Sequence, residues 1–188
     1  MSKNKITIAK AFDWYLTEIM PVVEKYTLQP VGGEHGLYTH TAAVVFRGID
    51  YALSYGRKPN SVILACAFHD MARINNAKDL MHGANAVPIA TMAMDEIGGV
   101  ANDTRRRILY AVENHFSQRP IRAPDYISAY TWDADRTRRA WYGGHRPQFF
   151  TSPRAQYVAS HAAAEYLEFM RHNMSAYARG IIEVSEYY

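Results

Sequence analysis

A histidine followed directly by an aspartate, His69-Asp70, closes the apolar run of residues 61–68. The run predicts the inner face of a buried helix. A buried carboxylate beside a buried imidazole is costly unless an opposite charge or a metal ion neutralises the pair. Other segments of the chain therefore have to fold against this pair and supply its partner.

Four further side chains that can ligate a metal are spread along the chain: His40, His82, His115 and Asp135. A single histidine on a helix is more often a packed core residue than a ligand. Here His40, His69 and His115 each share an apolar stripe at the spacing of one helix face. Three imidazoles are thus predicted to point inward from three helices, and a single interior metal site accounts for all of them.

Five segments form an ordered series of motifs: Gly36-Leu37-Tyr38-Thr39-His40-Thr41, Ala67-Phe68-His69-Asp70, Leu80-Met81-His82-Gly83-Ala84-Asn85-Ala86, Ala111-Val112-Glu113-Asn114-His115-Phe116-Ser117 and Asp133-Ala134-Asp135-Arg136. In order and approximate spacing they resemble the HD-domain metal-dependent phosphohydrolase superfamily. The resemblance covers about residues 30–140 and implies an all-α fold, a compact HD-domain helical bundle around a metal-binding pocket. We expect residues 1–188 to form a single HD-type domain, with extra helices at both ends of that core.

The resemblance also implies the metal ligands: His40, His69, Asp70 and Asp135. Asp133 and Asp135 are two positions apart, which turns them about 200° from each other on a helix, so only one can face the ion. The family pattern has alanine before the ligand and arginine after it, which selects Asp135. We expect Asp133 to orient a ligand histidine or Arg136. The alternative is a solvated charge on the helix surface.

His82 and His115 leave two interpretations open. With one bound ion, His82 suits phosphate binding or proton transfer, because its ordinary pKa of about 6.5 lies near neutrality. With two ions, both histidines ligate the second one while Asp70 bridges, at the separation of about 3.5 to 4 Å usual for paired metals. The simpler alternative for His82 is a loop residue that caps a helix starting near Gly83. His115 would then be a core residue.

The donor types limit the metal. Imidazole and carboxylate without thiolate suit one or two divalent ions of manganese, iron, cobalt, nickel, zinc or magnesium, and disfavour copper(I) and iron-sulfur clusters. Cys66, the only cysteine, lies in the apolar run and is expected to be a small core residue. A lone cysteine and a start without the apolar core of a secretory leader predict a cytoplasmic protein.

The composition limits the classes of molecule that the protein is expected to bind. A net charge of +3 is too small to indicate nucleic acid, and no apolar stretch reaches the ~20 residues that span a membrane. Arginines nevertheless crowd the second half of the chain, and the guanidinium fork matches phosphate. Arg136, next to Asp135, is the first candidate for a substrate phosphate contact, with an ion pair to Asp133 as its competing role. The oligomeric state is not predicted.

Helical periodicity and turn signals divide the chain. The expected helices cover residues 6–25, the His40 and His69 segments, 84–97, a helix capped by Asn102 or Asp103 that bears His115, 126–139 and 154–171. Residues 141–153 are expected to be irregular, and residues 180–184 could form one short strand.

The expected function is hydrolysis of a small phosphoester by metal-activated water, with Asp70 positioning the water and His82 or His115 protonating the leaving oxygen. A nucleotide substrate follows from analogy with the family alone. Two alternatives stay open: a di-iron oxygenase of the same fold, and a non-catalytic nucleotide-binding regulator.

Overall fold

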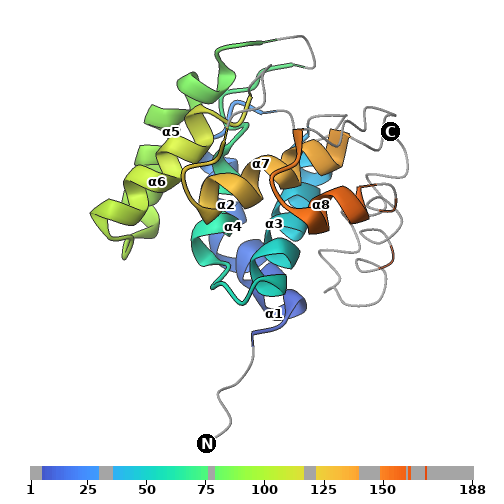
Figure 1. Ribbon diagram of the computed structural model, residues 1–188. Coiled ribbons are helices and arrows are strands. Elements are labelled where there is room, and N and C mark those ends of the chain that lie inside the picture. Colours follow the sequence, from blue (N-terminus) through green and yellow to red (C-terminus); the bar gives the residue numbers. More distant parts are fainter. Residues whose placement is uncertain are drawn as a thin grey trace, which may run out of the picture.

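The computed structural model describes residues 6–29, 36–75, 79–116, 122–139 and 149–159, together with His161 and Glu168. The regular elements of this described part are all helical, as predicted (Figure 1). None of its helices has the length and apolar character needed to cross a membrane. The tail strand considered for residues 180–184 and most of the irregular stretch 141–153 lie outside the described residues.

The first helical stretch runs without interruption from residue 8 to residue 26. It consists of α1 (Ile8–Trp14), a wide π-helical turn η1 (Tyr15–Ile19) and α2 (Met20–Tyr26). The wide turn ends two residues before Pro21, which has no N–H for the usual bond to the carbonyl four residues back. The N–H of Met20 reaches the carbonyl of Tyr15 instead. The predicted helix is therefore present, with a bulge where the proline requires one.

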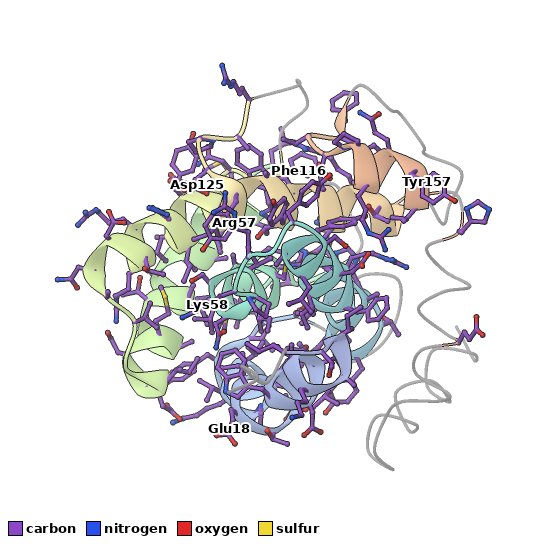
Figure 2. The ribbon with its side chains drawn as sticks, turned by 60° about the horizontal axis from the view of Figure 1, so that its bottom comes forward. Glu18, Arg57, Lys58, Phe116, Asp125 and Tyr157 are labelled. Carbon is purple, nitrogen blue, oxygen red and sulfur yellow. The ribbon has the colours of Figure 1, made fainter. Side chains whose placement is uncertain are left out.

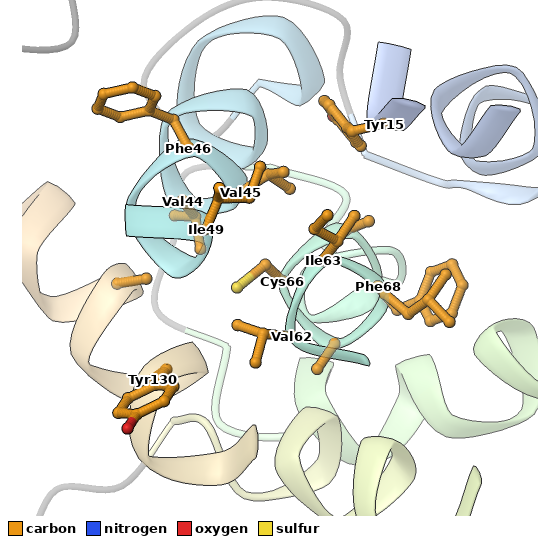
Figure 3. Packing of buried hydrophobic residues seen from close by; sticks show 14 of the residues in the cluster. Tyr15, Val44, Val45, Phe46, Ile49, Val62, Ile63, Cys66, Phe68 and Tyr130 are labelled. Carbon is orange, nitrogen blue, oxygen red and sulfur yellow. The ribbon is translucent and has the colours of Figure 1, made fainter. Parts of the chain in front are cut away.

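Two buried helices form the centre of the molecule. A π-helical turn η2 (Leu37–Thr41) leads into α3 (Ala42–Ser54), and α4 (Asn60–Phe68) packs against it. Residues 62–68 of α4 are all buried, and in Figure 3 the side chains of Val62, Ile63, Cys66 and Phe68 point in different directions from the helix axis. The sequence predicted that one face of this helix is buried, whereas the structure buries every face of it. The reason is that a helix with apolar residues on all sides is buried on all sides. A Cβ on Gly48 of α3 would lie 2.6 Å from the sulfur of Cys66, so these two helices pack very closely.

Four later helices surround this centre: α5 (His82–Ile97), α6 (Asn102–Glu113), α7 (Tyr126–Arg139) and α8 (Pro153–Val158). α7 packs against α3, α4 and α6, while α5 pairs with α6 on one side and α8 lies against α7 (Figure 1). The cap of α6 is Ala101, one residue before the predicted Asn102. A helix was expected over residues 154–171. The described residues of this region include α8, which ends at Val158, and most of residues 160–171 lie outside the described residues.

Many charged side chains lie on the outside of this bundle, as Glu18 and Lys58 illustrate (Figure 2). The predicted metal ligands lie instead in its interior and near helix ends. His69 and Asp70 follow directly after α4, His82 is the first residue of α5, and His115 stands two residues beyond α6. His40 lies in η2 and Asp135 in the second half of α7. The packing of the helices brings these positions together.

Candidate metal centre

Two histidines and two carboxylates form one half of the centre. The Nε2 atom of His40 lies 3.0 Å from Nε2 of His69 and 3.3 Å from Oδ1 of Asp135. Oδ2 of Asp70 lies 3.4 Å from Nε2 of His40 and 3.6 Å from Nε2 of His69. The four side chains implied by the family resemblance therefore meet at one interior point.

His82 and His115 form the other half. Their Nε2 atoms are 2.8 Å apart. Oδ1 of Asp70 lies 3.1 Å from Nε2 of His82 and 3.4 Å from Nε2 of His115. The two oxygens of Asp70 thus face different histidine pairs, which is the arrangement a carboxylate needs to bridge two ions. His82 lies in a helix and is buried, so its interpretation as a loop residue is wrong.

Backbone carbonyls orient three of the imidazoles. Nδ1 of His69 lies 2.7 Å from the carbonyl of Cys66, and Nδ1 of His115 lies 2.7 Å from the carbonyl of Val112. Nδ1 of His82 lies 2.5 Å from the carbonyl of Asp79. An Nδ1–H that donates to a carbonyl leaves the lone pair on Nε2, and this bond to a second group is the usual support of a metal-ligating histidine.

A glycine permits the close approach of the second pair. A Cβ on Gly83, next to His82, would lie 2.7 Å from the carbonyl oxygen of Glu113 and 2.9 Å from that of Val112. It would also lie 3.2 Å from Nδ1 of His115. The start of α5 can therefore pack against the end of α6 only without a side chain at position 83.

The pKa shifts of His69, Asp70 and Asp135 suit metal binding. Burial lowers the pKa of His69 to about 4, which keeps this imidazole neutral. Burial alone would raise the pKa of the Asp70 carboxyl, but the surrounding histidines hold the pKa well below its ordinary value. Burial is likewise outweighed at Asp135, where the hydrogen bond and charge of His40 keep the pKa low. Ionised carboxylates and neutral imidazoles are the forms that bind metal ions. At His115 burial lowers the pKa, but the hydrogen bond to Asp70 and the charge of Asp70 outweigh burial and raise the pKa, so a metal ion has to displace a more firmly held proton from this imidazole.

The residues fit a divalent cation. Two sets of three donors, His40 with His69 and Asp135, and His69 with Asp70 and His115, each have ligand atoms within 4.8 Å of one another. All six side chains of the centre are buried, and two buried carboxylates without a cation would be energetically costly. Nitrogen and oxygen donors without thiolate suit the metals named above. Cys66 is buried apart from these donor sets, and burial raises the pKa of its thiol to about 12.

Asp133 lies on α7 but serves another part of the structure. It is fully buried, so the alternative of a solvated surface charge is wrong. Its two oxygens accept hydrogen bonds from the N–H groups of Thr151, at 2.7 Å, and Ser152, at 2.8 Å. Ser152 in turn caps α8 through its hydroxyl. Within the described residues, Asp133 therefore fixes the segment leading into α8 and not a ligand histidine.

Arg136 is half-buried beside this segment. Its Nη1 donates to the carbonyl of Phe149 at 2.8 Å, and its guanidinium lies 5.8 Å from the centre of the Trp132 ring. Its charge also helps to lower the pKa of Asp133, which burial raises. These contacts test neither of the two roles considered for Arg136, so its ion pair with Asp133 and its contact with a substrate phosphate both stay predictions.

The sequence interpretation missed Arg73. This arginine is buried, and its Nη1 lies 3.4 Å from Nε2 of His82 and 4.0 Å from Oδ1 of Asp70. The available signal was its position three residues after Asp70, where a turn returns the chain to the same side. Phe116, labelled in Figure 2, also contacts the centre, with its ring 5.3 Å from that of His82.

Comparisons with known proteins give no match: no family model, no curated protein and no solved structure matches this chain.

Proposed function

We propose that this protein is a metal-dependent phosphohydrolase that acts on a small phosphoester. The observation that supports the proposal is the division of the Asp70 carboxylate between two histidine pairs, with Asp135 completing the first of them. A centre of this composition could hold two cations, which would supply positive charge for the binding of anionic oxygens. The resemblance of the motifs to the HD-domain superfamily supports the same chemistry.

Each ligand has a stated role in the proposal. His40, His69, Asp70 and Asp135 hold the first ion, and His82 and His115 share Asp70 with the second. A bound divalent ion lowers the pKa of a water molecule toward neutrality and neutralises charge on phosphoryl oxygens. Asp70, between the two halves, positions the attacking water. If only the first ion is bound, His82 or His115 is free of metal and protonates the leaving oxygen.

The burial of the centre bears on the substrate. The side chain of Asp135 is 12% exposed, whereas those of His69 and Asp70 are 0% and 3% exposed. Asp135 is the more exposed of these ligands, so the proposed approach of a substrate is from its side, and Arg136 is the neighbouring residue proposed to contact the phosphate. A buried centre favours a small reacting group. A nucleotide substrate is proposed by analogy with the family alone.

The test is a substrate panel. Nucleoside monophosphates, triphosphates, cyclic nucleotides and generic phosphoesters are incubated with the protein and Mn²⁺, Co²⁺, Ni²⁺ or Mg²⁺, and phosphate or the dephosphorylated product is measured. We expect turnover of at least one class with a bound metal and none with Asp70→Ala. Turnover that persists after complete metal removal contradicts the proposal.

A di-iron oxygenase is the second candidate, because two irons accept the same imidazole and carboxylate donors. Protein that contains two irons, consumes oxygen and releases no phosphate would favour it. A third possibility, a nucleotide-binding regulator, predicts tight nucleotide binding without turnover under every metal tested.

A further inference from the structure

Arg73 lies directly beside the second half of the metal centre. Its backbone N–H donates to the carbonyl of Asp70 at 2.8 Å, which closes the turn after α4 and directs the arginine back toward the centre. The arginine side chain is only 9% exposed. Its guanidinium is always protonated in proteins. A full positive charge is thus buried within the shell of groups that would surround the second ion.

The atoms that Arg73 faces are ligand atoms. Nη1 lies 3.4 Å from Nε2 of His82 and 4.0 Å from Oδ1 of Asp70. The second ion would need these same two atoms, together with Nε2 of His115, which lies 3.4 Å from Oδ1 of Asp70. A guanidinium and a divalent cation are both attracted to this oxygen and repel each other at such distances.

The two halves of the centre differ in their donors. The first half offers four protein donor atoms, from His40, His69, Asp135 and Oδ2 of Asp70. Within the described part of the chain, the second half has no oxygen donor comparable to Asp135, and Arg73 lies beside it. The second ion therefore meets fewer negative charges and one additional positive charge.

We infer that Arg73 competes with the second ion for Asp70 and His82, and so sets whether the centre holds one ion or two. With one ion bound, the guanidinium neutralises Oδ1 of Asp70. Binding of the second ion requires the side chain to withdraw from these two atoms. The second ion consequently binds more weakly than the first, and its occupancy follows the free metal concentration. This inference rests on the metal centre of the proposed function and is independent of the substrate.

The test measures metal binding with Mn²⁺ as the probe. Metal-free protein is titrated by calorimetry, and elemental analysis after equilibrium dialysis gives the stoichiometry at each Mn²⁺ concentration. For the wild type we expect one tight and one weaker equivalent. Arg73→Gln removes the charge and should tighten the second equivalent by about tenfold or more, with the first changed much less. Arg73→Lys keeps the charge and should bind like the wild type.

Arg47→Gln is the matched control, because Arg47 is also a buried arginine but pairs with Asp50 on α3. It should leave the second equivalent unchanged. The inference is overturned if Arg73→Gln leaves the second equivalent unchanged or weakens it, or if Arg47→Gln tightens it equally. Should Arg73→Gln not fold, the wild-type titration decides, since two equivalents of equal affinity also overturn the inference. A wild type that binds no divalent metal contradicts the proposed function itself. Metal-dependent hydrolysis together with an affinity for the second Mn²⁺ that is the same in the wild type and in Arg73→Gln contradicts this inference alone.

Discussion

Asp133 and Asp135 lie two residues apart on α7, and their carboxylates serve opposite sides of that helix. Oδ1 of Asp135 lies 3.3 Å from Nε2 of His40, inside the candidate metal centre. The oxygens of Asp133 accept the N–H groups of Thr151 and Ser152, ahead of α8. The helical rotation of about 200° over two residues produces this separation. One carboxylate binds the proposed ion, and the other holds the chain that packs over α7.

This separation makes the two aspartates distinguishable by mutation. Asp135→Ala should remove most of the bound metal and the activity that depends on it, because the first ion loses a charged ligand. Asp133→Ala should keep the metal but lower the free energy of unfolding by about 1 to 3 kcal/mol, since two N–H groups lose their acceptor. Elemental analysis of both variants measures the bound metal, and denaturant-unfolding curves measure the free energy of unfolding. Equal loss of metal in both variants would disprove the division of roles.

Asp70 is the residue whose loss should affect both halves of the centre. Asp70→Ala removes the oxygen near His40 and the oxygen near His82 together, so metal content should fall below one equivalent and hydrolysis should cease. Asp70→Asn keeps the shape of the side chain and removes its charge, and should bind more metal than the alanine variant but less than the wild type. Unchanged metal content in Asp70→Ala, measured by elemental analysis, would show that the ligands are assigned wrongly.

Much of this arrangement could be predicted from local sequence patterns. Apolar periodicity predicted helices that bear His40, His69 and His115. The helices are present, but α4 ends one residue before His69 and α6 ends two residues before His115, so these two histidines lie just beyond the helices predicted to carry them. The side chains of His40, His69 and Asp135 still come together as the motif order implied. Long-range partners could not be predicted in this way. The contacts of Asp133 with Thr151 and Ser152 join residues 18 and 19 positions apart, and nothing in the local pattern around Asp133 specifies them.

Arg73 was missed for a related physical reason. An arginine in a turn after a helix is expected at the surface, because charged side chains are rarely fully buried unless paired. Its burial follows from the ionised Asp70 beside it, and that contact depends on a turn whose geometry periodicity does not describe. The π-helical turn that carries His40 escaped prediction in the same way, since apolar spacing does not distinguish a wide turn from a regular one.

Gly83 provides a test of the close helix packing at the second half of the centre. Gly83→Ala places a methyl group against the carbonyls of Val112 and Glu113, and the Val112 carbonyl is the acceptor that orients His115. We expect a loss of the second equivalent of metal together with lower thermal stability. Gly48→Ala is the control, because its methyl group would instead meet the side chains of Cys66 and Val62, and neither of these side chains orients a ligand histidine. It should lower stability without a selective loss of the second ion. A Gly83→Ala protein that still binds two equivalents contradicts the prediction.

His82 and His115 test the number of ions most directly. If both ligate a second ion, His82→Ala and His115→Ala should each reduce the stoichiometry from two equivalents toward one while the first ion stays bound. The reason is that His40, His69 and Asp135 form a donor set without them. If the centre holds one ion, the same variants should keep their metal and lose turnover by roughly 100 to 10,000-fold, the usual contribution of a positioned proton donor. A metal titration and turnover measurements on both variants distinguish these outcomes. A wild type that saturates at one equivalent, together with a fully active His115→Ala protein, would exclude both roles and leave His115 as a core residue packed against His82.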